Sequence, residues 1–270
     1  MDTTRQGAAV IARGIGVEGP RGWAFRGVDI SAEPGELIAV QGPSGSGRTC
    51  LLLALTGRMR ITEGHATVAG FPLPKRMGTV RSRTAIAHVP GVADLEPALT
   101  VAEHLKEAAL LGRRLKGSPL ALPWSRGHKE ARRARIEAAL ATAGLDPETL
   151  PKGLRTAVRD LERIEALRLS VALGVLHDPH LLAVDDVDLK LSAAERDLAW
   201  QLLRDLARAG ITVVAAGSDA PGDALIVRTT AQDAPAREAA TDPTTAAGPH
   251  GPADTHEEDT ADAFAETGRA

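Results

Sequence analysis

Short apolar runs alternate with longer amphipathic segments along most of the chain. The runs Glu36–Val40, His180–Val184 and Ile211–Ala216 are apolar at nearly every position, which is typical of strands buried on both faces of a sheet. Shorter runs predict further strands at 8–18, 24–31, 65–69, 85–89 and 224–227. The pattern therefore predicts a sheet whose central strands are fully buried.

Helical periodicity fills most of the remaining chain. Helices are predicted over 48–57, from Thr100, over 130–143, over 161–176, and from Ser192 to Gly210. Thr100 with Glu103 and Ser192 with Glu195 form capping boxes, which satisfy the free N–H groups at a helix start. These two helix starts are therefore the best defined.

The order of these elements predicts the fold class. Strands that alternate with helices are typical of an α/β fold around a largely parallel sheet. The helical stretch between residues 92 and 178 predicts a subdomain at the side of that sheet. We therefore expect one domain over residues 1–230, with a helical subdomain at about 92–178.

Residues 231–270 differ from the rest of the chain in composition and charge. They carry nine acidic side chains against two arginines, and Phe264 is their one large apolar residue. Such a segment buries too little apolar surface to offset its chain entropy, so we expect a disordered acidic tail. The formal net charge of −3 therefore hides a mildly basic body.

Composition also limits the class of protein. The single cysteine, Cys50, excludes an intrachain disulfide framework and suits a reducing cytoplasm. No apolar run is long enough for a membrane span and no signal peptide is expected, so any place at the inner face of the cell membrane would come through a partner. Aromatic residues are only 2% of the chain, which argues against nucleic-acid binding by base stacking.

A glycine-rich loop joins the first buried strand to the helix at 48–57. Its spacing, Gly-x4-Gly followed by Arg and Thr, is that of a P-loop with Arg48 in the place of lysine. Backbone N–H groups in such a loop surround a phosphate at the positive end of the helix, and the Thr49 hydroxyl can bind Mg²⁺. The predicted phosphate-binding residues are Gly42, Ser44, Gly45, Ser46, Gly47, Arg48 and Thr49. The alternative is a strand-to-helix turn without a ligand.

A second pair of chemical groups ends the buried strand at 180–184. Asp185 and Asp186 follow this apolar run, as acids do in P-loop enzymes where the first holds Mg²⁺ and the second orients the attacking water. We therefore predict Asp185 as a metal ligand and Asp186 as a catalytic base. Taken alone, the two acids could equally begin a turn.

With these motifs in order, residues 8 to 229 resemble the ATP-binding cassette (ABC) ATPases. Ala32–Glu36 is similar to the family's approach to the P-loop, Ile61–Gly70 to the segment after it, and Ala98–Leu105 to the start of its helical subdomain. Leu176–Asp185 is similar to its Walker B approach. The resemblance implies a P-loop fold with a mostly parallel core, antiparallel N-terminal strands and a helical subdomain, and it implies ATP and Mg²⁺ as ligands.

Several positions depart from the family at the nucleotide. The glutamine that reaches the Mg²⁺ aligns with Gly91, and the switch histidine aligns with Ser218. The acid after the Walker B aspartate is normally glutamate, and Asp186 is one methylene shorter. An adenine-stacking aromatic aligns roughly with Gly19; Trp23 is a substitute, although we favour packing in the core for its ring.

The family's signature, which binds the nucleotide of a second subunit, departs as well. It aligns with Leu161–Glu165, where Glu162 and Glu165 would repel a triphosphate and Ile164 adds bulk. The D-loop aspartate aligns with Ser192, which we expect to cap a helix. Since both halves of a shared site are altered, we expect no nucleotide-sandwiched homodimer.

The resemblance implies an ABC-type ATP-binding subunit that works with an integral membrane partner, and the departures from the family imply that it hydrolyses ATP weakly or not at all. One alternative is an active ATPase that powers transport. Another is a regulatory scaffold that binds no nucleotide.

Overall fold

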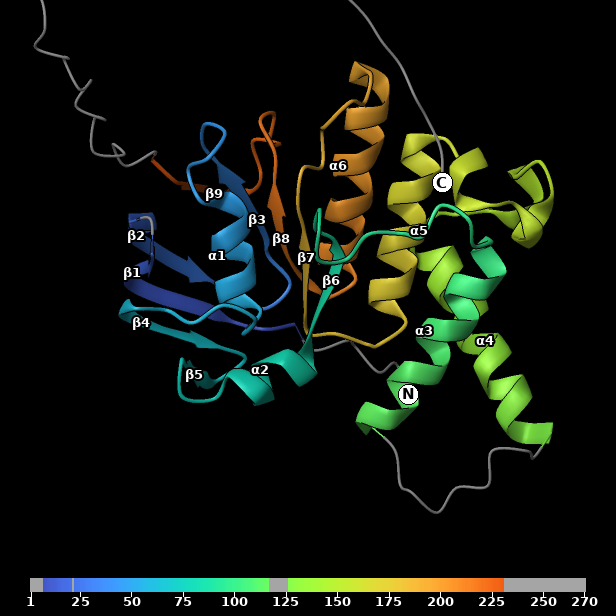
Figure 1. Cartoon of the computed structure of the whole chain (residues 1–270), viewed down its shortest axis with the longest axis horizontal. Coiled ribbons are helices and arrows are strands. Elements are labelled where there is room, and N and C mark those ends of the chain that lie inside the picture. Colours follow the sequence, from blue (N-terminus) through green and yellow to red (C-terminus); the bar gives the residue numbers. More distant parts are fainter. Residues whose placement is uncertain (1–6, 21, 117–125, 231–270) are drawn as a thin grey trace, which may run out of the picture. The chain divides into compact units, whose positions relative to one another are not determined.

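The computed structural model describes residues 7–20, 22–116 and 126–230. Within these residues the strands form two sheets (Figure 1). The antiparallel sheet consists, in spatial order, of β2 (Gly22–Ala32), β1 (Val10–Gly19), β4 (Glu63–Val68) and β5 (Phe71–Leu73). The parallel sheet consists of β6 (Thr84–His88), β7 (Leu181–Val184), β8 (Thr212–Ala216), β3 (Leu37–Gln41) and β9 (Leu225–Arg228).

The helices of the described residues connect these strands. They are α1 (Arg48–Leu55), α2 (Met77–Arg83), α3 (Val101–Lys116), α4 (Arg126–Thr142), α5 (Arg163–Val175) and α6 (Ala193–Arg208). Three short 3₁₀ helices, Pro147–Thr149, Gly153–Arg155 and Val158–Asp160, lie between α4 and α5.

The two faces of the parallel sheet belong to two different cores. Successive residues of a strand point to opposite faces, so Ile38 and Val40 of β3 pack with α1 and the antiparallel sheet. Leu37 and Ala39 of the same strand pack on the other side, in the core that α3, α4, α5 and α6 share. Helix α1 contacts strands of both sheets, which fixes its first turn at the end of β3.

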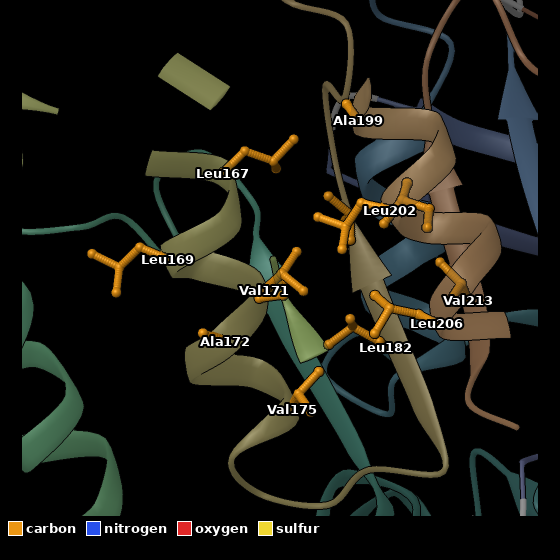
Figure 2. Packing of buried hydrophobic residues seen from close by; sticks show 14 of the residues in the cluster. Leu167, Leu169, Val171, Ala172, Val175, Leu182, Ala199, Leu202, Leu206 and Val213 are labelled. Atoms are coloured by element: carbon orange, nitrogen blue, oxygen red, sulfur yellow. The ribbon is translucent and has the colours of Figure 1, made fainter. Parts of the chain in front are cut away.

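Helix α5 is buried on more than one side. Figure 2 shows Val171 and Val175 on the side that faces Leu182 of β7, and Leu169 on the opposite side of the helix. All four side chains are buried, because α3 and α4 also pack against α5. A helix that is apolar around its circumference is typical of such a position. The first turn of α5 lines a cavity that is also lined by Asp186, the residue that follows Asp185.

The predicted fold class is confirmed, and the predicted strands and helices are present with ends shifted by a few residues. The short elements β5 and α2 were not predicted. The helical subdomain at 92–178 contains α3, α4 and α5, and its independence stays a prediction. The acidic tail at 231–270 lies outside the described residues.

In the part of the chain that the structure describes, none of the helices combines the length and apolar character needed to cross a membrane.

Candidate phosphate-binding site

The P-loop, residues 42–49, lies between the end of β3 and the start of α1. Gly47 is the residue before the helix, with a φ of 82°, and no side chain caps the helix there. The first N–H groups of a helix have no partners within the helix, and they carry its positive dipole end. An uncapped helix start after a glycine-rich loop is suited to bind an anion such as phosphate.

Two of the glycines allow the loop to pack closely on its surroundings. A Cβ atom at Gly47 would lie 2.1 Å from the carbonyl oxygen of Ala24, and one at Gly42 would lie 2.4 Å from that of Thr229. Gly45 has a φ of 80° and open space beside it. Gly45 therefore serves the backbone conformation, whereas Gly42 and Gly47 also make room for neighbouring backbone.

Ser46 holds the loop to the protein interior. Its side chain is buried, its hydroxyl forms a 2.7 Å hydrogen bond with the hydroxyl of Thr229, and its N–H donates to the carbonyl oxygen of Pro43. Ser44, by contrast, is exposed. Of the predicted phosphate-binding residues, Ser46 is thus engaged by the protein itself. No sequence pattern marks Thr229, because its contact with Ser46 depends on the placement of β9 beside β3.

Thr49 and Asp185, the two predicted metal ligands, are in direct contact. The Thr49 hydroxyl donates a short hydrogen bond to Oδ2 of Asp185, and the N–H of Asp186 donates to Oδ1 at 3.0 Å. Asp185 is almost fully buried. Burial raises the pKa of its carboxyl group, and the nearby charge of Asp186 raises it further, against the opposing effect of the Thr49 hydrogen bond.

The donor set at this point fits Mg²⁺. A hydroxyl and a carboxylate are oxygen ligands, and Mg²⁺ usually takes one or two protein oxygens and completes its shell with phosphates and water. The described residues hold no cluster of three or more His, Cys, Asp or Glu side chains that would form a metal cage. A metal here would therefore depend on the nucleotide that accompanies it.

Arg48 and Asp186 form an ion pair across the site. Nη2 of Arg48 lies 3.6 Å from Oδ1 of Asp186, and the two side chains are only 20% and 29% exposed. Asp186 has a φ of 47°, a left-handed conformation that a residue other than glycine rarely adopts. The predicted catalytic base thus contacts the cation of the P-loop. The sequence pattern indicates a separate role for each residue and does not specify the contact between them.

A third acid, Asp188, holds the end of the neighbouring strand β8. The N–H of Ser218 donates to Oδ2 of Asp188 at 2.5 Å, and the Ser218 hydroxyl donates a short hydrogen bond to the same oxygen. Both donors of Ser218 are therefore engaged. The signal for Asp188 in the sequence is a third acid close behind Asp185 and Asp186, and its partner Ser218 is 30 residues away.

Comparison with known proteins identifies the family. The model of the family described as "ABC transporter" matches residues 25–188. The chain belongs to the ABC transporter family. Members of this family bind ATP, typically with Mg²⁺.

Individual relatives agree with this assignment. Nod factor export ATP-binding protein I of Cupriavidus metallidurans is 30% identical over 188 residues, covering 69% of this chain and 55% of that protein. Fructose import ATP-binding protein FruK of Bifidobacterium longum is 28% identical over 213 residues, covering 78% of this chain and 38% of that protein. The chain thus spans about half the length, or less, of these relatives.

Solved structures agree on the fold. The dimeric structure of MJ0796, a bacterial ABC transporter cassette, has a TM-score of 0.64 at 19% identity and covers 82% of this chain and 94% of that one. The structure of cbiO1 from Clostridium perfringens, part of the ABC transporter complex cbiONQ, has a TM-score of 0.63 at 19% identity, covering 79% of this chain and 80% of that one.

The segment aligned with the family's signature lies at the start of α5. Glu162 precedes α5 and forms a capping box with Glu165, whose carboxylate accepts the N–H of Glu162 at 2.8 Å. Ile164 is buried in the core, so the expectation that its bulk lies at the nucleotide face is wrong. Its side chain turns inward because α5 is buried, and the two acids remain at the helix start.

The ring of Trp23 is engaged within the antiparallel sheet. The guanidinium of Arg26 lies 4.6 Å from the centre of the ring, and Arg26 also pairs with Glu63 at 2.6 Å. Phe25 is fully buried. Phe25 therefore lies in the core, whereas Trp23 is half-buried at the edge of it, so the expectation of core packing is wrong for the Trp23 ring.

Proposed function

We propose that this chain is an ABC-type ATP-binding subunit that binds nucleotide with Mg²⁺, hydrolyses ATP weakly or not at all, and acts with an integral membrane partner at the inner face of the cell membrane. The observation that supports the proposal is that the groups for binding phosphate and Mg²⁺ are in place, whereas the acid expected to act in catalysis is engaged by another side chain. The P-loop backbone and the Thr49–Asp185 oxygen pair are in place, whereas the Asp186 carboxylate is paired with Arg48.

The residues present divide the work of binding. The N–H groups at the start of α1 would hold the phosphates, and Thr49 with Asp185 would hold Mg²⁺. When bound, Mg²⁺ would neutralise phosphate charge and fix the orientation of the phosphates. No side chain reaches from Gly91, and Ser218 is already bonded to Asp188.

Hydrolysis requires more precise placement of the catalytic groups than nucleotide binding does. A general base must lie within hydrogen-bond reach of the water from which it takes a proton. The carboxylate of Asp186 is one methylene shorter than the usual glutamate, and its contact with the guanidinium of Arg48 holds it away from the position of an attacking water. Both effects favour slow or absent turnover.

Calorimetry on the full chain tests nucleotide binding. We expect Mg-ATP and Mg-ADP to bind, and we expect Thr49→Val to weaken binding because it removes the metal-binding hydroxyl and keeps the shape. Thr67→Val in β4 is the matched control and should bind like the wild type. Gly47→Val is a poor test, since its Cβ would overlap Ala24 and disturb the fold. Absence of binding at millimolar nucleotide would favour the scaffold alternative.

Phosphate release tests hydrolysis. We expect the wild type to match Asp185→Asn within error. Arg48→Lys should bind nucleotide more tightly, because an ammonium is a compact charge that fits between phosphates, and the further change Asp186→Glu should raise hydrolysis slightly. Wild-type turnover clearly above the Asp185→Asn background would establish the active ATPase instead.

A groove beside β6 supports the membrane partner. It has a volume of about 500 Å³ and is bordered by Arg58, Arg81, Val92, Leu111 and Leu173 among others. Val92 and Leu111 are 55% and 52% exposed, and clustered exposed apolar side chains mark interaction sites. Apolar side chains beside two arginines fit a cytoplasmic segment of the partner that carries apolar and acidic residues.

Co-purification tests the partner. A polytopic membrane protein encoded beside this chain should co-purify with it, and Leu111→Asp together with Arg81→Glu should abolish that association. Unchanged co-purification of the double variant would exclude the groove as the docking site.

A further inference from the structure

We propose that this site prefers a nucleoside diphosphate to a triphosphate, because Arg48 is held by Asp186 and Ser218 by Asp188. The inference rests on the proposed nucleotide binding and names the ligand class of that site. It concerns the γ-phosphate alone.

The contacts available to a β-phosphate need no rearrangement of charged side chains. They are backbone N–H groups at the uncapped start of α1, reached through the positive-φ glycines Gly45 and Gly47. A diphosphate can therefore use the P-loop as the structure shows it.

A γ-phosphate depends on the cation at position 48. In P-loop proteins the backbone N–H groups hold the α- and β-phosphates, whereas this side chain reaches the β- and γ-phosphates, so the γ-phosphate depends on the cation most. Here the guanidinium of Arg48 is 3.6 Å from the Asp186 carboxylate, and both side chains are largely shielded from solvent. To contact a γ-phosphate, Arg48 must leave Asp186, and that carboxylate then stays without its cation beside the buried Asp185. A triphosphate must therefore compete with an existing ion pair.

The ends of three adjacent parallel strands place the other acids at the same edge. The sheet order β7-β8-β3 puts Asp185, Asp186 and Asp188 after β7, Ser218 after β8, and the P-loop after β3. The hydroxyl and N–H of Ser218 both donate to Asp188. Ser218 consequently offers no unengaged donor, and the edge carries carboxylates that repel additional phosphate charge. Such repulsion is poorly screened where water is partly excluded.

Calorimetric titration of the full chain with Mg-ADP and with Mg-ATP tests the preference. We expect Mg-ADP to bind about tenfold more tightly, the effect of losing one charge-assisted contact. Asp186→Asn should tighten Mg-ATP about tenfold and change Mg-ADP by less than about threefold, because Arg48 is released toward the γ-phosphate. In an Arg48→Ala background the same substitution should give a clearly smaller selective gain, because only the repulsion between Asp186 and the γ-phosphate is then relieved. Asp197→Asn, at an exposed acid on α6, is the matched control and should leave both affinities unchanged.

Several results would overturn the inference. Tighter binding of Mg-ATP than Mg-ADP by the wild type is one, and an equal gain for both nucleotides in Asp186→Asn is another, since that would be a general charge effect. If Asp186→Asn fails to fold by circular dichroism, Asp188→Ala takes its place: it removes the acceptor of both Ser218 hydrogen bonds, and the same selective gain for Mg-ATP is expected from the released donors. Failure of both nucleotides to bind would refute the proposed function itself, which separates the two cases.

Discussion

The carboxylate of Asp188 accepts two hydrogen bonds from Ser218, so its state of ionisation affects the stability of the fold. Partial burial opposes its ionisation, but the Ser218 hydroxyl and N–H donate to the ionised form and the net effect lowers the pKa of Asp188. Because the folded pKa lies below the unfolded one, the ionised group stabilises the fold above the unfolded pKa of about 3.9. That stability is lost as the pH falls through the lowered folded pKa.

We therefore expect the stability lost on Asp188→Asn to be largest at pH 6 to 7 and to shrink as the pH falls below about 4. Urea unfolding of the wild type and the variant, from pH 7 to pH 3, measures the difference. A loss that stays constant across this range would show that the pKa of Asp188 is not lowered.

Asp185 should show the opposite dependence of stability on pH. Its folded pKa is raised, first by burial, so its ionised form disfavours folding at neutral pH. That cost should vanish as the pH falls through the raised folded pKa. The free energy of unfolding of the wild type, relative to Asp185→Asn, should consequently rise on acidification, in contrast to the Asp188 comparison.

Among the elements, α5 combines a buried body with a start built from two acids. Its capping box joins Glu162 and Glu165, and removing a capping partner typically costs about 1 kcal/mol. We expect Glu165→Ala to lower the free energy of unfolding by about 1 kcal/mol and Glu162→Ser to leave it nearly unchanged, because serine is itself a favoured residue at this position.

Urea unfolding at pH 7 measures both changes. Glu107→Ala, at an exposed glutamate of α3, is the matched control for loss of a surface carboxylate. If Glu162→Ser were as destabilising as Glu165→Ala, the carboxylate of Glu162 would have a contact beyond the capping box. The variant Glu162→Ser is also the one that alters the acidic face of the signature segment without removing its cap.

For the whole molecule, we expect no ATP-sandwiched homodimer. Closing such a dimer brings Glu162 and Glu165 of one copy toward the nucleotide of the other, and Gly91, Ser192 and Ser218 provide few contacts to offset the repulsion between like charges. Light scattering at micromolar protein, with Mg-ATP or a slowly hydrolysed analogue, should show no nucleotide-dependent dimer.

A dimer in that experiment would contradict the expectation and call for a second variant. Glu162→Ser combined with Arg163→Gly should then leave the dimer unchanged or strengthen it. If this pair of substitutions abolished the dimer, the acidic segment would be an adapted interface rather than a barrier to association.

The sequence by itself determined the order and type of the main elements, the position of the P-loop, and the two acids that follow the strand at 180–184. These depend on local patterns: apolar runs, capping boxes, and glycine spacing before a helix. The three-residue strand β5 and the helix α2 were missed because elements this short show no reliable period.

The tertiary structure alone decided which polar groups meet. The burial of Ser46 against Thr229, the pairing of Arg48 with Asp186 and the bonding of Ser218 to Asp188 join residues on different strands and loops. Such contacts follow from the strand order β7-β8-β3-β9, and no local pattern specifies that order. Ile164 turned inward for the same reason, because the packing of α5 between the sheet and its neighbouring helices decides which of its side chains are buried.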